Sequence, residues 1–126
     1  MSRADLETSG RHRVIVTAGD ADLRRALRFL LQVEGYAVDA LDSGAALLAS
    51  AQSQADCLVV DQDLPGVSGL DALRALRRKL KTPAVLLVGD ADRKLRAEAR
   101  QARVELVVKP FHGGQLLALV RSALEP

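Results

Sequence analysis

Two charged residues stand directly after short apolar runs, and their chemistry makes them the first candidates for a functional site. Asp61 follows residues 58–60, and Lys109 follows residues 107–108; a turn signal comes soon after each. Such a run is typical of a buried strand that ends at a charge. Ligands of open parallel sheets bind at the carboxyl ends of the strands. An aspartate and a lysine brought together there would form a phosphoryl or anion site.

The composition is that of one globular domain. The chain has 126 residues, of which 48% are apolar and 27% charged, and at this length about two-thirds of the unfolded surface becomes buried. No apolar run approaches the ~20 residues that span a membrane. Residues 1–13 lack the apolar stretch of a signal peptide, and we predict that they form a flexible leader before a domain over residues 14–126. A cytoplasmic location is the expectation.

The strands and helices that must position Asp61 and Lys109 follow from the apolar periodicity. Strands are predicted over residues 14–18, 36–41, 57–60, 84–88 and 104–108. The helices between them are predicted to start at Asp20 or Asp22, Ser43, Ser68, Asp90 and the pair Gly113-Gly114. Gly35 should end the first helix, and Pro83 the third, with Leu80 on its inner face. Five strands alternating with five helices predict an α/β fold, a doubly wound parallel sheet.

Two motifs resemble those of the response-regulator receiver domain of bacterial two-component phosphorelay signalling. They are the spacing Asp61-x-x-Leu64-Pro65-x-x-x-Gly69 and the triplet Lys109-Pro110-Phe111, and the resemblance covers residues 14–124. It implies a flavodoxin-like strand order 2-1-3-4-5. It also implies that Asp61 is the phosphoacceptor, Lys109 the phosphate-contacting cation and residues 62–67 the rim of the pocket.

Three features of the sequence depart from the pattern of that family. Ala18 and Gly19 stand where the family has two adjacent acids that hold Mg²⁺, a cation that proteins usually bind through carboxylates. Val88 stands where a Ser or Thr contacts the phosphoryl oxygen, and Leu106 stands where a Tyr or Phe changes rotamer on activation. We therefore expect a divergent pseudo-receiver that needs no cofactor, with Mg²⁺ binding lost or weak.

Several alternatives stay open at this point. Asp61 is either a structural aspartate paired with Lys109 or a phosphoacceptor in a functional receiver domain. Asp20 and Asp63 are acids that would build a substitute metal site with Asp61. The run Asp61-Gln62-Asp63 also resembles the Asp-x-Asp motif of haloacid-dehalogenase phosphatases, in which the first aspartate attacks phosphorus.

The expected function is protein–protein interaction, without catalytic turnover. A histidine kinase, another signalling protein or a second copy of the chain would be the partner. The region of the fourth helix and fifth strand has five basic residues that suit an acidic partner: Arg93, Lys94, Arg96, Arg100 and Arg103. Because the basic residues of the whole chain are spread over several segments, we expect neither nucleic acid nor membrane as a partner. His12 and His112 are isolated and predicted to be exposed, and the single cysteine, Cys57, is predicted to fill the core.

Overall fold

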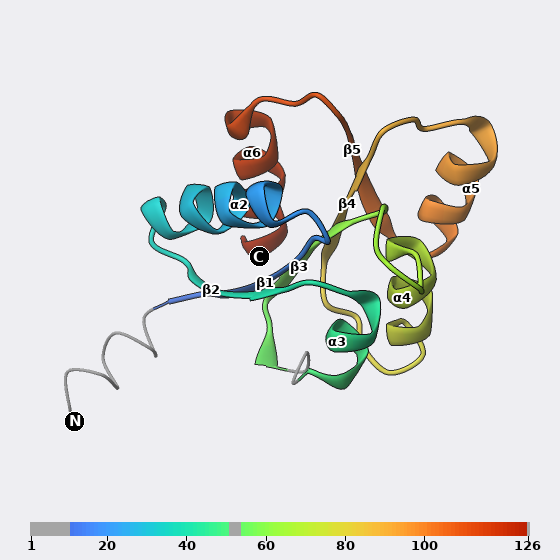
Figure 1. The fold of residues 1–126 in the computed structure, drawn as a ribbon, viewed down its shortest axis with the longest axis horizontal. Coiled ribbons are helices and arrows are strands. Elements are labelled where there is room, and N and C mark those ends of the chain that lie inside the picture. Colours follow the sequence, from blue (N-terminus) through green and yellow to red (C-terminus); the bar gives the residue numbers. More distant parts are fainter. Residues whose placement is uncertain (1–10, 51–53, 126) are drawn as a thin grey trace.

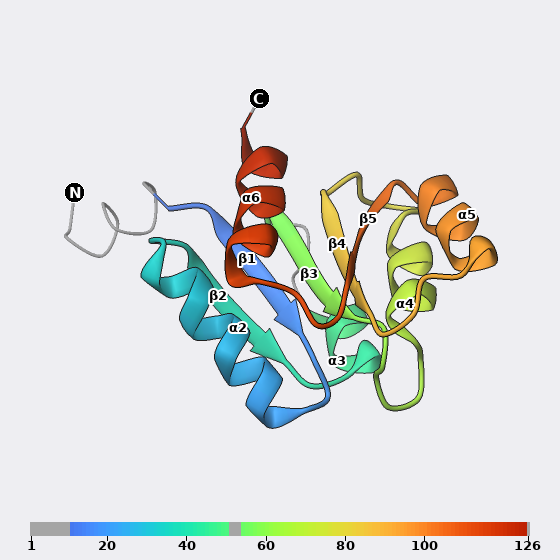
Figure 2. The same cartoon turned by 90° about the horizontal axis from the view of Figure 1, so that it is seen from above.

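The computed structural model describes residues 11–50 and 54–125. Five parallel strands form one sheet there, in the order β2-β1-β3-β4-β5. They are β1 (Arg13–Thr17), β2 (Ala37–Leu41), β3 (Cys57–Asp61), β4 (Ala84–Val88) and β5 (Val104–Val108). Figure 2 shows the strands side by side, with their carboxyl ends at one edge of the sheet. The predicted fold class and strand order are confirmed.

Helices cover both faces of the sheet. On one face lie α2 (Ala21–Val33) and α6 (Gly113–Leu124), and on the other α3 (Gly44–Ala49), α4 (Gly69–Leu76) and α5 (Arg93–Gln101) (Figure 1). Because alternate residues of a strand point to opposite faces, the strands contribute to two apolar clusters. Val59 and Leu87 belong to the cluster under α2 and α6, and Leu58 and Leu86 to the cluster under α3, α4 and α5. No helix among the described residues is long and apolar enough to cross a membrane.

Side chains cap the starts of four of the helices. Each cap accepts a hydrogen bond from a backbone N–H in the first turn of α2, α3, α4 or α5, and the caps are Asp20, Ser43, Ser68 and Asp92. Two of these starts were predicted outright, and for α2 the cap is Asp20 rather than Asp22. The start of α5 lies later than predicted because Asp92, not Asp90, is its cap. Gly35 follows α2 with a φ of 95°, a backbone conformation that suits the predicted helix-ending glycine.

β1 begins one residue before the predicted start of the domain. Arg13 pairs in register with Ala37 of β2, and its side chain and its N–H are both bound. Its guanidinium lies 2.7 Å from Asp39 Oδ2, and its N–H donates to Asp56 Oδ2 at 2.7 Å. The part of the expected leader over residues 1–10 lies outside the described residues.

The predicted end of α4 is also wrong. The helix ends at Leu76, well before Pro83, although Leu80 still packs against the core. After Leu76 the backbone changes to i→i−3 hydrogen bonds, since the Arg78 and Lys79 N–H groups donate to the carbonyl oxygens of Ala75 and Leu76. In the same turn, Arg77 Nε donates to the carbonyl oxygen of Ala102 at 2.8 Å. This contact fixes the turn after α4 against the end of α5.

Candidate functional site

The carboxyl edge of the sheet brings Asp61 and Lys109 together. Asp61 is the last residue of β3, Lys109 follows β5, and Lys109 Nζ lies 2.8 Å from Asp61 Oδ1. The Asp61 side chain is 4% exposed and that of Lys109 is 32% exposed, so the ammonium group connects a buried carboxylate to solvent. The strand between them anchors the lysine, since the Lys109 N–H donates to the carbonyl oxygen of Val88 at 2.8 Å. The expected ion pair is therefore present.

The loop after Asp61 is fixed to both the carboxylate and α4. The Asp63 N–H lies 3.3 Å from Asp61 Oδ1, and Gln62 Oε1 accepts from the Leu70 N–H at 2.8 Å. A Cβ on Gly69 would overlap the Asp61 carbonyl oxygen, which explains the glycine at this distance from the aspartate in the motif. Sequence reasoning missed the part played by Gln62, because an amide that reaches eight residues forward has no sequence signature.

The end of β1, on the other side of Asp61, has no carboxylate. Ala18 is fully buried, and a Cβ on Gly19 would lie 3.1 Å from Pro65 Cδ and 3.6 Å from the carbonyl oxygen of Asp63. A Mg²⁺ ion beside Asp61 would meet a single carboxylate that already has Lys109 as its counter-charge. The residues present therefore do not fit this metal, which needs several oxygen ligands in octahedral geometry.

The substitute metal site is not formed. Asp20 accepts a hydrogen bond from the Asp22 N–H at 3.2 Å as the cap of α2, and Asp63 is an exposed residue of the loop. Across residues 11–50 and 54–125, no group of three or more His, Cys, Asp or Glu side chains is placed to hold a metal ion. Asp20 and Asp63 thus have local roles and do not join Asp61 in a site.

Val88, the position predicted to lack a Ser or Thr, is the last residue of β4. It is 1% exposed and packs in the cluster under α3, α4 and α5. It is in register with Val108, just before Lys109, and its carbonyl oxygen accepts the Lys109 N–H. Valine has no hydroxyl, and the absence of a phosphoryl-oxygen donor at this position stays a prediction.

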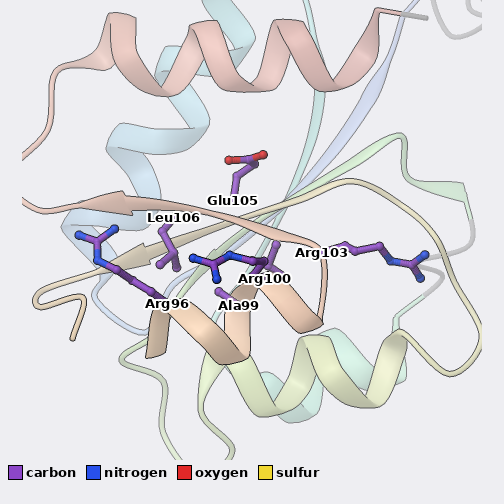
Figure 3. Close-up of a pocket in the computed structure, with 7 residues that line it drawn as sticks. Arg96, Ala99, Arg100, Arg103, Glu105 and Leu106 are labelled. Carbon is purple, nitrogen blue, oxygen red and sulfur yellow. The ribbon is translucent and has the colours of Figure 1, made fainter. Parts of the chain in front are cut away.

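A second feature, a groove of about 550 Å³, lies between α5 and β5 (Figure 3). Its lining combines an apolar part with basic side chains: Ala99, Val104 and Leu106, then Arg96, Arg100 and Arg103, with Glu105 beside them. Leu106, at the position of the expected switch residue, is half-buried and packs against the core. Figure 3 shows Glu105 pointing to the other side of β5 from Leu106.

The positive charge of this groove is not balanced locally. Among the described residues, 11–50 and 54–125, no acidic side chain forms an ion pair with Arg96, Arg100 or Arg103. Glu98, which lies on α5, pairs instead with Arg74 at 3.1 Å. Arg103 has a φ of 56°, in the left-handed region that costs a non-glycine residue roughly 1–2 kcal/mol. The pKa of Arg77 is lowered, mainly by burial and to a smaller extent by the positive charge of Arg103. The groove therefore holds unpaired cations, one of them on an unfavourable backbone.

The histidines and the cysteine do not add to the site. His12 and His112 are exposed, as predicted; His12 Nδ1 lies 3.7 Å from Asp56 Oδ2, and His112 precedes α6 without a side-chain capping bond. Cys57 is fully buried, and burial raises the pKa of its thiol to about 12. A thiol that stays protonated inside the core acts as a small apolar residue.

Comparison with known proteins gives the family of this chain. The family model described as "Response regulator receiver domain" matches residues 14–121. The chain belongs to the response-regulator receiver domain family. This membership decides against the haloacid-dehalogenase alternative.

Among curated relatives, this receiver domain is 36% identical over 113 residues to the transcriptional regulatory protein KdpE of Mycobacterium tuberculosis, covering 88% of this chain and 50% of the relative. It is 34% identical over 114 residues to the transcriptional regulatory protein FixJ of Azorhizobium caulinodans, covering 88% of this chain and 54% of the relative. The chain thus spans about half the length of the curated relatives it matches.

Solved structures share the receiver fold. The chemotaxis protein CheY4 of Vibrio cholerae superposes with a TM-score of 0.83 at 24% identity, covering 90% of this chain and 99% of that one. The receiver domain of the Francisella response regulator 1452 gives a TM-score of 0.84 at 20% identity, covering 90% and 97%. At these identities the likeness concerns the fold alone.

Removal of Lys109 tests how strongly the receiver domain depends on the ion pair. We expect Lys109→Met to lower the free energy of unfolding by about 2–3 kcal/mol, because the Asp61 carboxylate is left buried without a counter-charge, and partial exposure of the lysine moderates the loss. Lys94→Met is the matched control: the Lys94 side chain is 87% exposed and its Nζ lies 3.9 Å from Glu98, so the change should stay within about 0.5 kcal/mol. Urea denaturation measures both. Equal losses would contradict a stabilising role for the pair.

Proposed function

We propose that this receiver domain is impaired in metal-dependent phosphorylation and acts in bacterial two-component signalling as a non-catalytic protein-interaction module. The observation that supports this most directly is the charge of the pocket. Asp61 is its one buried carboxylate, Lys109 Nζ lies 2.8 Å from it, and the end of β1 has Ala18 and Gly19 where a metal would need acids.

Charge neutralisation explains why such a pocket would transfer phosphoryl groups poorly. Catalysis of phosphoryl transfer comes almost entirely from positioning and from cations that offset the charge of the donor. Here a dianionic donor would approach a carboxylate with Lys109 as the cation in contact with it. Because that ammonium already neutralises Asp61, little positive charge remains for the incoming phosphoryl group.

The positions of the usual switch support a domain with one dominant conformation. Val88 provides no hydroxyl to hold a phosphoryl oxygen, and Leu106 has no ring that could turn between two positions. A ligand shifts a conformational equilibrium only through interactions that differ between the two states. With these groups absent, partner binding would be constitutive, and the amount of protein or of partner would regulate it.

Phosphorylation at Asp61 is the second candidate function, and the retained ion pair favours it. Asp61 and Lys109 keep the placement that the family's phosphoacceptor and phosphate-contacting lysine would need at the strand ends. The two functions differ in their dependence on Mg²⁺, which the first experiment below measures.

The proposed partner is an acidic protein, either a histidine kinase or another signalling protein, that docks on the groove between α5 and β5; a second copy of the chain is the remaining option. Three arginines of α5 recur at spacings of three and four, Arg93, Arg96 and Arg100, and this spacing places side chains on one helix face. Arg103, two residues beyond the end of α5, also lines the groove. An amphipathic acidic segment would match these charges and cover the apolar lining. Signalling of this kind takes place in the cytoplasm, where we place the protein.

Titration with Mg²⁺ tests the proposal. We expect no saturable change in the amide resonances around Asp61 up to millimolar Mg²⁺, because Ala18 and Gly19 provide no ligand. The double variant Ala18→Asp/Gly19→Asp, with Gly19→Asp alone as the smaller change, is the control that should gain saturable binding. Saturable shifts in the natural chain would contradict the proposal and favour phosphorylation at Asp61.

A phosphate mimic tests the single conformation. With beryllofluoride and Mg²⁺, we expect the amide spectrum of α5 and β5 to stay unchanged, since neither Val88 nor Leu106 can transmit an event at Asp61. A change limited to residues 61–63 is compatible with the proposal. Shifts that extend through Leu106 into α5 would show that a switch exists by another route.

Replacement of Arg103 separates binding from folding. Arg103→Gly removes one charge of the groove and also relieves the left-handed backbone, so we expect a melting temperature that is unchanged or slightly raised. Affinity for a helical peptide with glutamates at matching spacings should fall about threefold to tenfold. Arg78→Ser, at an exposed arginine outside the groove, is the control that should leave affinity unchanged. Equal affinity of the Arg103 variant and the natural chain would contradict docking on this surface.

A further inference from the structure

Arg24 contacts the end of β1, where Ala18 and Gly19 provide no charged side chain. Its Nη1 donates to the carbonyl oxygen of Ala18 at 2.9 Å and to that of Gly19 at 3.3 Å. The side chain is half-buried and starts from the second turn of α2, so it folds back over the start of its own helix. Within the part of the chain that the structure describes, no carboxylate lies in ion-pair range of it. Its neighbour Arg25, by contrast, pairs with Asp22 at 2.7 Å on the surface.

Arg24 is a cation at the start of a helix, where cations are unfavourable, and this suggests that it has a role outside α2. The start of a helix has a partial positive charge, and a cation near it is unfavourable. Arg24 nevertheless lies there, and its compensation comes from two carbonyl oxygens outside the helix. Where a local preference is broken in this way, a functional reason is the first one to test.

These two carbonyl groups belong to the edge that holds Asp61. β1 and β3 are adjacent and parallel, with Thr17 in register with Val60, so Ala18 lies beside Asp61 at the usual strand separation of about 4.8 Å. The backbone of Gly19 also faces the loop after Asp61, because a Cβ there would lie 3.6 Å from the carbonyl oxygen of Asp63. A group that fixes Ala18 and Gly19 therefore fixes one wall of the Asp61 pocket.

We propose that Arg24 is a positioning residue and the resident cation of this edge, holding the turn between β1 and α2 where receiver domains otherwise use acids and a divalent ion. The inference rests on the proposed function, since it assumes that no metal occupies the edge. Lys109 pairs with Asp61 directly, and Arg24 binds the carbonyl groups at the adjacent strand end. The turn between β1 and α2 is then ordered without Mg²⁺.

The first test uses the natural chain and compares two adjacent arginines. Arg24→Met should lower the melting temperature by about 4 °C, because charged hydrogen bonds to two carbonyl groups are lost. It should also shift the amide resonances of Ala18, Gly19 and residues 63–65. Arg25→Met should change the melting temperature by about 1 °C or less, because it removes an exposed pair. Shifts of the Arg24 variant confined to α2 would overturn the inference.

The second test measures Mg²⁺ affinity, which should not increase when an arginine with a purely structural role is removed. In the Ala18→Asp/Gly19→Asp background, or in Gly19→Asp if the double variant does not fold, adding Arg24→Met should tighten Mg²⁺ binding about tenfold, because a like charge is removed from the metal's surroundings. Arg24→Lys keeps the charge and should leave Mg²⁺ affinity near that of the parent. Equal or weaker Mg²⁺ binding after Arg24→Met would overturn the inference.

The two proposals can fail separately. Saturable Mg²⁺ binding by the natural chain would contradict the proposed function, whatever Arg24 does. If the natural chain binds no Mg²⁺ and Arg24→Met leaves Ala18, Gly19 and residues 63–65 unchanged, the role of Arg24 fails alone. The comparison of Arg24→Met with Arg25→Met decides this even where the acid-substituted variants bind no metal.

Discussion

A carboxylate buried at the end of a parallel strand requires a counter-charge, and Lys109 provides one for Asp61 at 2.8 Å. This constraint accounts for much of the surrounding structure. The strand between them anchors the lysine backbone, the loop after Asp61 gives an N–H to the same carboxylate oxygen, and Gly69 lets α4 start against the Asp61 carbonyl. We therefore expect the ion pair to stabilise the fold whether or not Asp61 takes part in phosphoryl chemistry.

The charges elsewhere in the domain follow the same reasoning. At the carboxyl edge, Arg24 binds backbone oxygens at the end of β1, and Lys109 neutralises the buried Asp61. On the surface of α5 the opposite holds, since unpaired arginines line a groove with an apolar part. The proposed interaction role rests on these two features, the pairing of Asp61 with Lys109 and the unpaired arginines of the groove.

The sequence predicted the features that depend on short-range patterns. Apolar runs predicted the strands, glycine and serine signals predicted several helix ends, and the rule that parallel strands end at one edge placed Asp61 beside Lys109. Features that depend on tertiary contacts were missed. The contact of Arg77 with Ala102 after the end of α4 and the reach of Arg24 to a turn behind its own helix have no sequence signature. The sequence also does not indicate that Arg103 adopts a left-handed backbone conformation.

The central claim, that Asp61 is not an efficient phosphoacceptor, is tested most directly by intact-protein mass spectrometry. The natural chain is measured before and after incubation with a small phosphodonor and Mg²⁺, beside Asp61→Asn as the blank and Ala18→Asp/Gly19→Asp as the acid-restored form. The account predicts that the natural chain matches the blank. The account would be contradicted if the natural chain gained the mass of one phosphoryl group and the Asp61→Asn variant did not.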